Sequence, residues 1–123
     1  MSFVHSETVR FRDLDSLGHM NNAVYATFLE QARIAFLAPL GAEVTNMILA
    51  RLEIDFRAQV SLGEEVEIEV TPSRVGTKSF ELSYTMRVGE TVVAEAKSVL
   101  VAYDYRTERS IDVPDAWREV LAA

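Results

Sequence analysis

The regular alternation of apolar and polar residues in the second half of the chain constrains its fold more than any other feature. From residue 47 to residue 88, apolar residues take every second position of three segments, and most positions between them are charged or hydroxylated. Successive side chains of a strand point to opposite faces, so this period of two predicts antiparallel strands that are apolar on one face. We expect strands at 47–58, 65–71 and 80–88, and a longer one at 91–105.

The stretch that precedes these strands has a different period. From Asn22 to about Leu37, apolar residues recur every three or four positions and leave only a narrow polar side, which predicts a mostly buried helix. Pro39 and Gly41 are expected to end it. On its polar side, Glu30 and Arg33 are expected to form a surface ion pair.

Two elements are expected at the ends of the chain. Residues 4–12 alternate and predict a first strand, with Phe11 on its apolar face. A short helix is expected to begin near Pro114, since proline suits the first turn of a helix. Between the long strands, Val88-Gly89-Glu90-Thr91 suits a tight hairpin because Gly89 is free to adopt positive φ.

One amphipathic sheet and one apolar helix bury their apolar faces together when the sheet wraps around the helix. The sequence therefore predicts an α+β chain of the hot-dog architecture, with a long antiparallel sheet around a central helix. Small residues at Ala94, Ala96 and Ser98 are expected to let the helix lie close to the last strand. An uncovered edge strand and an incompletely covered helix favour a homodimer or homotetramer.

Composition narrows the class of protein. The 123 residues are expected to form a single domain, 1–123, and the absence of cysteine fits a cytoplasmic location. With two histidines and no cysteine, no metal site is expected. A net charge of −7 makes nucleic acid an unfavourable partner. No apolar run approaches the roughly 20 residues of a membrane span, and the start of the chain does not resemble a signal peptide.

A polar segment, "DLDSLGHMNNAVY", occupies residues 13–25 between the expected first strand and the helix. One interpretation is helix capping: Asn21 is a suitable N-cap, and Asp15 can form a turn that Gly18 completes. The other is catalysis, because a helix N-terminus offers free N–H groups to a developing oxyanion. A carboxylate just upstream would then act as nucleophile or general base on a thioester. Spacing alone leaves both interpretations open.

The segment from Arg10 to Arg33, "RFRDLDSLGHMNNAVYATFLEQAR", closely resembles the signature of the 4-hydroxybenzoyl-CoA thioesterase-like branch of the hot-dog superfamily. These proteins are acyl-CoA thioesterases. The matching residues are Phe11, Asp13, Asp15, Gly18, His19, Asn21, Asn22, Tyr25, Glu30 and Arg33. Later segments such as "LEIDFRAQVSLGEEVEIEV" and "IDVPDAWREVL" also resemble the family, so the resemblance covers nearly the full chain.

The resemblance implies hydrolysis of acyl-CoA thioesters to free acid and CoA, with no cofactor. It assigns the catalytic carboxylate to Asp15 and the oxyanion donor to a backbone N–H near Asn22, while Asp13 holds the loop. Some relatives have tyrosine where Phe11 stands and histidine where Asn22 stands, so this chain lacks that hydroxyl and that imidazole.

The expected substrate-binding residues fall in two parts of the chain. They are His19, Asn21, Asn22 and Tyr25 near the helix start, and Lys78 and Ser79 in the loop after residue 75. Lys78, with Arg74, would meet CoA phosphates, and Ser79 would bind the substrate. Each has a structural alternative: packing for His19 and Tyr25, and a solvated loop for Lys78 and Ser79.

Two other functions compete with hydrolysis. Enoyl-thioester hydratases of this fold carry Asp-x-Asn-Pro-x-His, with the acid and the imidazole five positions apart. Here Asp15 and His19 are four apart and the Asn-Pro element is missing. The second alternative is a non-catalytic domain that binds acyl thioesters, against which the retained Asp15 argues. The sequence leaves open the acyl group and the choice between CoA and acyl-carrier-protein thioesters.

Overall fold

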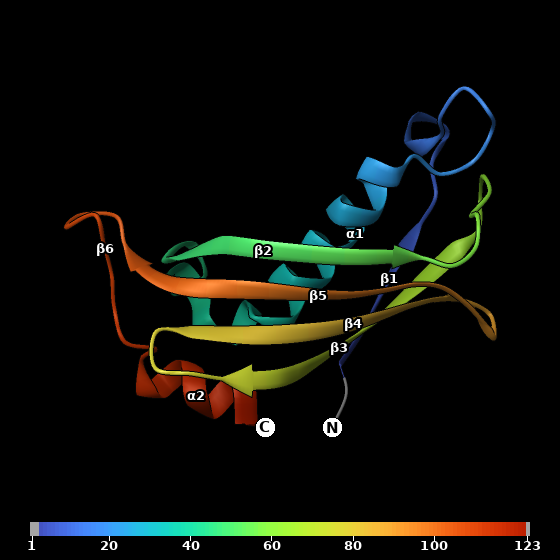
Figure 1. Ribbon diagram of the computed structural model, residues 1–123. Coiled ribbons are helices and arrows are strands. Elements are labelled where there is room, and N and C mark those ends of the chain that lie inside the picture. Colours follow the sequence, from blue (N-terminus) through green and yellow to red (C-terminus); the bar gives the residue numbers. More distant parts are fainter. Residues whose placement is uncertain (1–2, 123) are drawn as a thin grey trace.

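The computed structural model describes residues 3–122, which form a sheet with helices on one side (Figure 1). The elements in chain order are β1 (Phe3–Thr8), η1 (Phe11–Asp13), α1 (Asn22–Phe36), η2 (Ala38–Thr45), β2 (Met47–Phe56), β3 (Glu65–Val75), β4 (Ser79–Val88), β5 (Thr91–Asp104), β6 (Arg109–Ser110) and α2 (Asp115–Ala122). The η segments are short 3₁₀ helices. The order of expected elements is confirmed.

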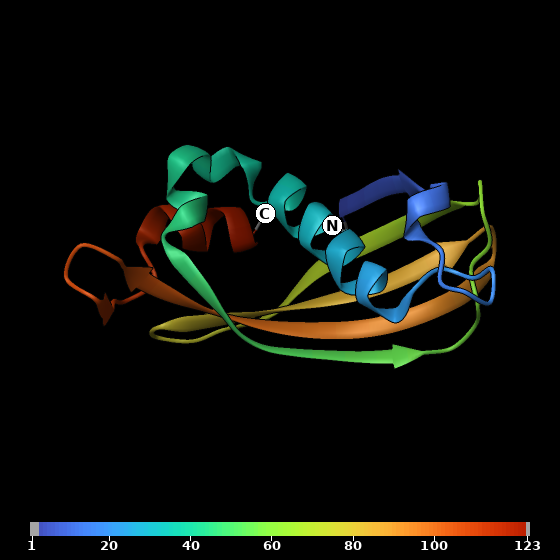
Figure 2. The ribbon, with the colours of Figure 1, turned by 90° about the horizontal axis from the view of Figure 1, so that it is seen from above.

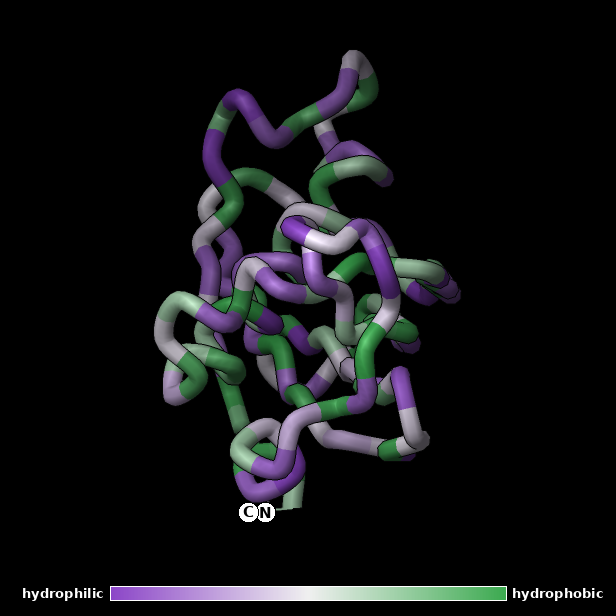
Figure 3. The backbone as a smooth tube through the Cα atoms, turned by 90° about the vertical axis from the view of Figure 1, so that its left-hand side faces the viewer, coloured by the Kyte–Doolittle hydropathy of each residue, from purple (hydrophilic) through white to green (hydrophobic). Residues whose placement is uncertain are grey.

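The main strands are antiparallel neighbours in the order β1-β3-β4-β5-β2, and the short β6 pairs with β5. The sheet curves around α1, and α2 and η2 lie on the same side of the sheet as α1 (Figure 2). Buried and more exposed positions alternate along β3 and β4. Hydrophilic and hydrophobic residues are interspersed along the backbone (Figure 3). This arrangement is the α+β hot-dog architecture that the sequence predicted, with β1 and β2 as the sheet edges.

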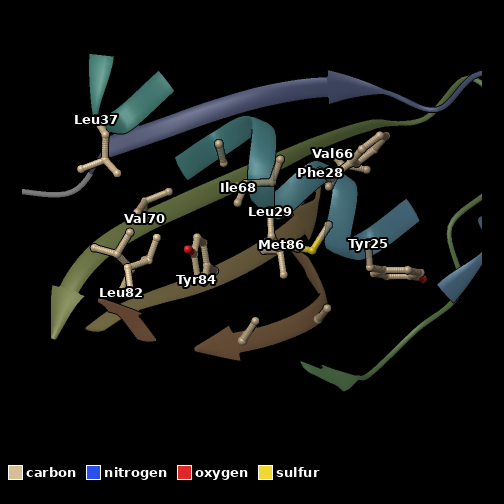
Figure 4. Close-up of a cluster of buried hydrophobic side chains, with 14 of the residues drawn as sticks. Tyr25, Phe28, Leu29, Leu37, Val66, Ile68, Val70, Leu82, Tyr84 and Met86 are labelled. Atoms are coloured by element: carbon tan, nitrogen blue, oxygen red, sulfur yellow. The ribbon is translucent and has the colours of Figure 1, made fainter. Parts of the chain in front are cut away.

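The core forms where the apolar stripe of α1 meets the inward face of β3 and β4 (Figure 4). The largest contributors from the helix are Phe28 and Leu29, which are buried with Ile68, Leu82 and Met86 from the sheet. Burial of one such side chain is worth about 1.5–3 kcal/mol, so this stripe holds the helix in place.

The small residues of β5 do not serve the purpose expected of them. Helix α1 packs against β1 and β3 over more of its length than against β5. Ala94 and Ala96 instead lie opposite the bulky Met86 and Tyr84 of β4, and Ser98 contacts the Tyr84 hydroxyl.

The first strand is shorter than expected because a tight turn interrupts it. It ends at Thr8, and residues Phe11–Asp13 form the 3₁₀ helix η1. The Asp13 carboxylate accepts a hydrogen bond from the Arg10 amide at 2.8 Å, which closes this turn. As a result Phe11 is 80% exposed, and its expected place on the apolar face of a strand is wrong.

Strand β2 departs from strict alternation because it is an edge strand with a bulge. Its register with β5 shifts between Leu49 and Arg51, and the strand ends at Phe56 rather than at residue 58. Leu49 is 41% exposed and Phe56 is 48% exposed. The apolar side of β2 is therefore only partly covered by α1.

Two expectations at the second hairpin and the C-terminus are confirmed. Gly89 has φ of 60°, and Val88 pairs with Thr91 across a two-residue turn. Helix α2 follows Pro114, whose carbonyl accepts from the Trp117 amide. The Trp117 ring packs edge-to-face on Phe80, which anchors α2 to the sheet. None of the helices in residues 3–122 has the length and apolarity that crossing a membrane requires.

The expected i,i+3 ion pair of Glu30 and Arg33 is present, but Arg33 does not lie at the surface. Arg33 is buried, and its Nη1 donates to the Tyr84 hydroxyl at 3.3 Å, while Nη2 lies 4.0 Å from the Glu30 carboxylate. Arg33 lies on the side of α1 that faces the sheet, so the long apolar stem of its side chain is buried with the core.

Candidate active site

A pocket of about 290 Å³ opens where the loop before α1 meets the end of β2. Its lining combines polar groups from residues 15–22 with apolar groups from α1 and β2, namely Asp15, His19, Met20, Asn22, Tyr25 and Phe56. Residues 57–59 complete the wall. In Figure 1 this region lies at the right, where the two connecting loops meet.

Asp15 is held by the backbone of its own loop. Its Oδ1 accepts from the amides of Leu17 at 2.8 Å and of His19 at 3.2 Å. Gly18 has φ of 85°, a conformation that suits glycine, and its amide donates to the Asp15 carbonyl. Within residues 3–122, Oδ2 has no hydrogen-bond partner. One carboxylate oxygen is therefore fixed and the other is available for chemistry.

A second loop docks onto this one and forms the opposite wall. The Met20 amide donates to the Val60 carbonyl at 2.7 Å, and His19 forms an isolated bridge with Ser61. These contacts bring Ala58 and Gln59 to the pocket, although they are more than 35 positions from Met20 in the chain. Neither they nor Met20 stood out in the sequence, because nothing in either loop indicates which other loop it pairs with.

The start of α1 presents one uncommitted donor. The Asn21 side chain accepts from the Ala23 amide at 2.9 Å, and the Asn21 carbonyl accepts from the Val24 amide. In the described part of the chain, the Asn22 amide has no acceptor. It lies at the positive end of the helix dipole, where a developing oxyanion would be stabilised. Asn22 lines the pocket, whereas Asn21 serves as the N-cap and does not.

Tyr25 forms an apolar wall whose polar tip is already engaged. Its hydroxyl donates to the Ala58 carbonyl at 3.1 Å, and its ring meets the Phe56 ring edge-to-face at 4.9 Å. Burial raises the pKa of Tyr25 above its ordinary value, so the phenol is neutral at physiological pH. This side chain shapes the pocket and links α1 to the docked loop.

His19 contributes a buried ring nitrogen, Nδ1, that lacks a hydrogen-bond partner among the residues that the structure describes. Buried polar atoms are nearly always paired with protein or water. A water molecule or a substrate atom in the pocket would satisfy this nitrogen.

Asp13 does not line the pocket and is instead paired with Arg10. Its carboxylate accepts from the Arg10 amide at 2.8 Å, from Nε at 3.1 Å and from Nη2 at 3.0 Å. These bonds hold the pKa of Asp13 below its usual range and raise the pKa of Arg10. The structural role expected for Asp13 agrees with this position.

Lys78 and Ser79 lie at the far end of the sheet from this pocket. Ser79 begins β4 and Met86 lies near its other end, opposite Ala94, so about 23 Å of strand separates them. Lys78 forms an ion pair with Asp112 at 3.1 Å. Within one chain these two residues do not meet Asp15. No group of three or more potential metal ligands occurs among residues 3–122.

Comparison with known proteins identifies the family. Residues 9–121 match the thioesterase-like superfamily. The chain belongs to this superfamily. A 1,4-dihydroxy-2-naphthoyl-CoA hydrolase from Nostoc punctiforme is 28% identical over 126 residues, which cover 94% of this chain and 83% of that protein.

Solved structures of thioesterases agree with this family. A thioesterase from Thermus thermophilus, complexed with coenzyme A and zinc, is 32% identical with a TM-score of 0.88, covering 96% of this chain and 90% of that one. A predicted thioesterase from Bacillus stearothermophilus has a TM-score of 0.91 at 25% identity, covering 99% and 95%. The resemblance seen in residues 10–33 is confirmed, and so is the expected enzyme class, a thioester hydrolase.

Proposed function

We propose that this thioesterase hydrolyses acyl-CoA thioesters, with Asp15 as nucleophile or general base and the Asn22 amide as oxyanion donor. One observation carries the assignment: Asp15, which has one free carboxylate oxygen, and Asn22, whose amide has no acceptor among the described residues, line the same pocket. The CoA thioester is supported by relatives named as a CoA-ester hydrolase and as a thioesterase complexed with coenzyme A.

In the general-base route, Asp15 takes a proton from water as the water oxygen bonds to the thioester carbon. The carbonyl oxygen becomes an oxyanion, which the Asn22 amide stabilises. Collapse of this intermediate breaks the C–S bond and releases thiolate, a leaving group that needs little acid assistance. Asp15 then gives its proton to the released thiolate, which leaves the free thiol and restores the carboxylate.

In the nucleophilic route, the Asp15 carboxylate itself bonds to the carbonyl carbon and expels the thiolate. The resulting anhydride is hydrolysed by water, which restores the carboxylate. Both routes use the same two groups. Incorporation of labelled oxygen from water into the Asp15 carboxylate in a single turnover would occur only in the nucleophilic route.

The remaining pocket residues orient the substrate. The rings of Tyr25 and Phe56 provide an apolar wall for the first atoms of the acyl group. The unpartnered Nδ1 of His19 would hold water or a substrate oxygen. Asn21 acts indirectly, because its capping of Ala23 leaves the Asn22 amide as the exposed donor.

We further propose that two copies join their sheets at β2, whose apolar side α1 covers only in part. Ile48 of β2 lies opposite Val101, which in turn lies opposite Ser79. If two β2 strands pair antiparallel, the start of one lies beside the end of the other. Ser79 and Lys78 of one copy then reach the same end of the joined sheet as the pocket of its partner, where they would bind CoA.

The test is release of free thiol from acetyl-, hexanoyl-, dodecanoyl- and benzoyl-CoA by the wild type and by Asp15→Asn. We expect turnover of at least one ester by the wild type and a large loss in the variant. Binding of the esters without thiol release by the wild type would indicate a non-catalytic domain. In a parallel assay with an enoyl-CoA, loss of its absorbance without thiol release would indicate a hydratase.

A further inference from the structure

Two more hollows follow the pocket along the seam between α1 and β2. The first, of about 160 Å³, is lined by Ala26, Thr27, Leu49 and Leu52. The second, of about 210 Å³, is lined by Ile34, Leu37, Met47 and Leu100. Glu30 and Arg33 line both. From the pocket to the second hollow, the residue numbers of the α1 lining increase and those of the β2 lining decrease. The hollows therefore lie in a row along the seam, and we call this row the α1–β2 groove.

The groove starts beside the groups that would hold the thioester carbonyl. Asn22 and Tyr25 line the pocket, and Ala26 lines the first hollow. From Asn22 to Arg33 the helix advances by roughly 16 Å. An extended acyl chain whose carbonyl lies at the Asn22 amide would follow this row and reach Arg33 with its distal part.

Arg33 is a buried cation with donors to spare. Its side chain is only 9% exposed, and one N–H, on Nη1, donates to the Tyr84 hydroxyl at 3.3 Å. Tyr84 is itself held by Ser98 at 2.5 Å. The guanidinium has five N–H groups, and its contact with Glu30, at 4.0 Å, is longer than a hydrogen bond. Buried charged donors without acceptors are costly, so a ligand acceptor would be favourable here.

Glu30 decides which acceptor fits. Its carboxylate lines the same two hollows as Arg33, which places an acceptor beside the donors. A hydroxyl group both accepts and donates, so it can bond Arg33 and Glu30 at once. A second carboxylate would meet repulsion from Glu30, and a plain methylene chain would leave Arg33 unpaired.

We propose that the α1–β2 groove holds the acyl chain and that Arg33 and Glu30 select acyl thioesters carrying a hydroxyl group far from the thioester. This inference rests on the proposed function and specifies its substrate class. Arg33 and Glu30 are specificity residues that contact the acyl group, and they take no part in bond breaking. If copies join at β2, the partner roofs the groove, and the acyl chain enters from the Asp15 end.

The test compares kcat/KM for dodecanoyl-CoA and for its terminal hydroxy and terminal carboxy analogues. We expect the wild type to prefer the hydroxy ester over the plain ester by about 10- to 100-fold, the range of hydrogen bonds to a charged group. Arg33→Met keeps the length of the side chain without its donors and should bring this ratio close to one. Arg109→Met, at an exposed position of β6 outside the groove, is the matched control and should leave the ratio unchanged.

Glu30→Gln separates the two specificity residues. It removes the repulsion but keeps an acceptor, so turnover of the carboxy ester should rise relative to the hydroxy ester. If Arg33→Met does not fold, Tyr84→Phe, which removes the anchor of Nη1, is measured in its place and should weaken the hydroxy preference.

Equal kcat/KM for the hydroxy and plain esters in the wild type would overturn the inference, as would a preference for the carboxy ester. So would an equal loss on all three esters in Arg33→Met together with a changed sedimentation coefficient, which indicates a role in assembly. If the wild type releases no thiol, the proposed function fails. The inference is then tested by calorimetric dissociation constants for the same esters, which should retain the hydroxy preference.

Discussion

Two hydrogen bonds join Asp15 and His19, one between their main chains and one from the His19 amide to the Asp15 carboxylate. The Asp15 amide donates to the His19 carbonyl at 2.8 Å, and the His19 amide donates to Asp15 Oδ1 at 3.2 Å. The two side chains line one pocket, yet no hydrogen bond joins the carboxylate to the imidazole in the described structure. The carboxylate is therefore positioned by amides rather than paired with a histidine, and its own basicity is what the reaction would use.

Asp15→Asn tests this directly. Asparagine keeps an acceptor for the Leu17 and His19 amides but removes the charge and the basicity of the free oxygen. General-base assistance is worth about 10²- to 10⁴-fold, so kcat should fall by about that factor with little change in KM. The measurement is steady-state thiol release. Near wild-type turnover by the folded variant would contradict a catalytic role for Asp15 and would indicate that this loop only caps the helix.

Asp13→Asn should act on stability instead of turnover. Its carboxylate holds Arg10 by three hydrogen bonds, and the partly exposed guanidinium weakens the effect, so we expect a loss of about 1–2 kcal/mol. The pKa of Asp13 is lowered in the folded state by the Arg10 hydrogen bonds. Its contribution to stability is therefore present above pH 3.8, the ordinary value, and disappears as the pH falls through the lower folded-state pKa.

Urea unfolding at a series of pH values, from about pH 6 down through the usual range of carboxyl titration, checks this prediction. The wild type should lose stability relative to Asp13→Asn as the pH drops below 3.8. Parallel stability curves for the two proteins over this range would contradict the assigned ion pair.

Asn21→Ala removes the N-cap of α1. The loss of the side-chain bond to the Ala23 amide should cost about 1 kcal/mol, within the usual range of about 0.5–2. Asn21→Asp, which keeps a capping oxygen, is the control and should restore stability. Because Asn21 does not line the pocket, KM should change little in the aspartate variant. A large rise in KM in that variant would indicate that Asn21 contacts the substrate.

Tyr25→Phe removes the hydroxyl that donates to the Ala58 carbonyl and should cost about 1 kcal/mol near neutral pH. Burial raises the folded-state pKa of Tyr25 above 10.0. The neutral phenol thus favours folding below that pH, and this contribution is lost as the pH rises through the folded-state pKa. The stability gap between wild type and Tyr25→Phe should narrow above pH 10.0 in urea unfolding. A constant gap would contradict it.

Leu49→Lys tests the assembly at β2. Leu49 is a half-exposed apolar residue of this edge strand, and a charge there should disfavour edge-to-edge joining of two copies. Sedimentation of this variant at micromolar concentration should show a smaller species. A separate assay should show reduced thiol release. Val4→Lys, at an exposed apolar position of the other edge strand, is the matched control. An oligomer broken by Val4→Lys but not by Leu49→Lys would place the interface at β1.

Local patterns determined most of the secondary structure. The helix of residues 22–36, its Asn21 cap, the Gly89 hairpin and the start of α2 all depend on periodicity, capping and turn chemistry over a few residues. The apolar stripe of α1 and the period of two in β3 and β4 also predicted that the sheet wraps the helix. The segment from Asp13 to Tyr25 identified the family and the candidate catalytic carboxylate before any long-range contact was known.

Only the tertiary structure decided which of these groups meet. Lys78 and Ser79 lie at the far end of the sheet, Ala58 and Gln59 join the pocket, and Arg33 is buried against Tyr84. Each outcome depends on strand order or on the docking of two loops, which are set by pairings distant in sequence. A period identifies the face of an element, but the neighbour that covers that face is chosen by the free energy of the whole packed chain.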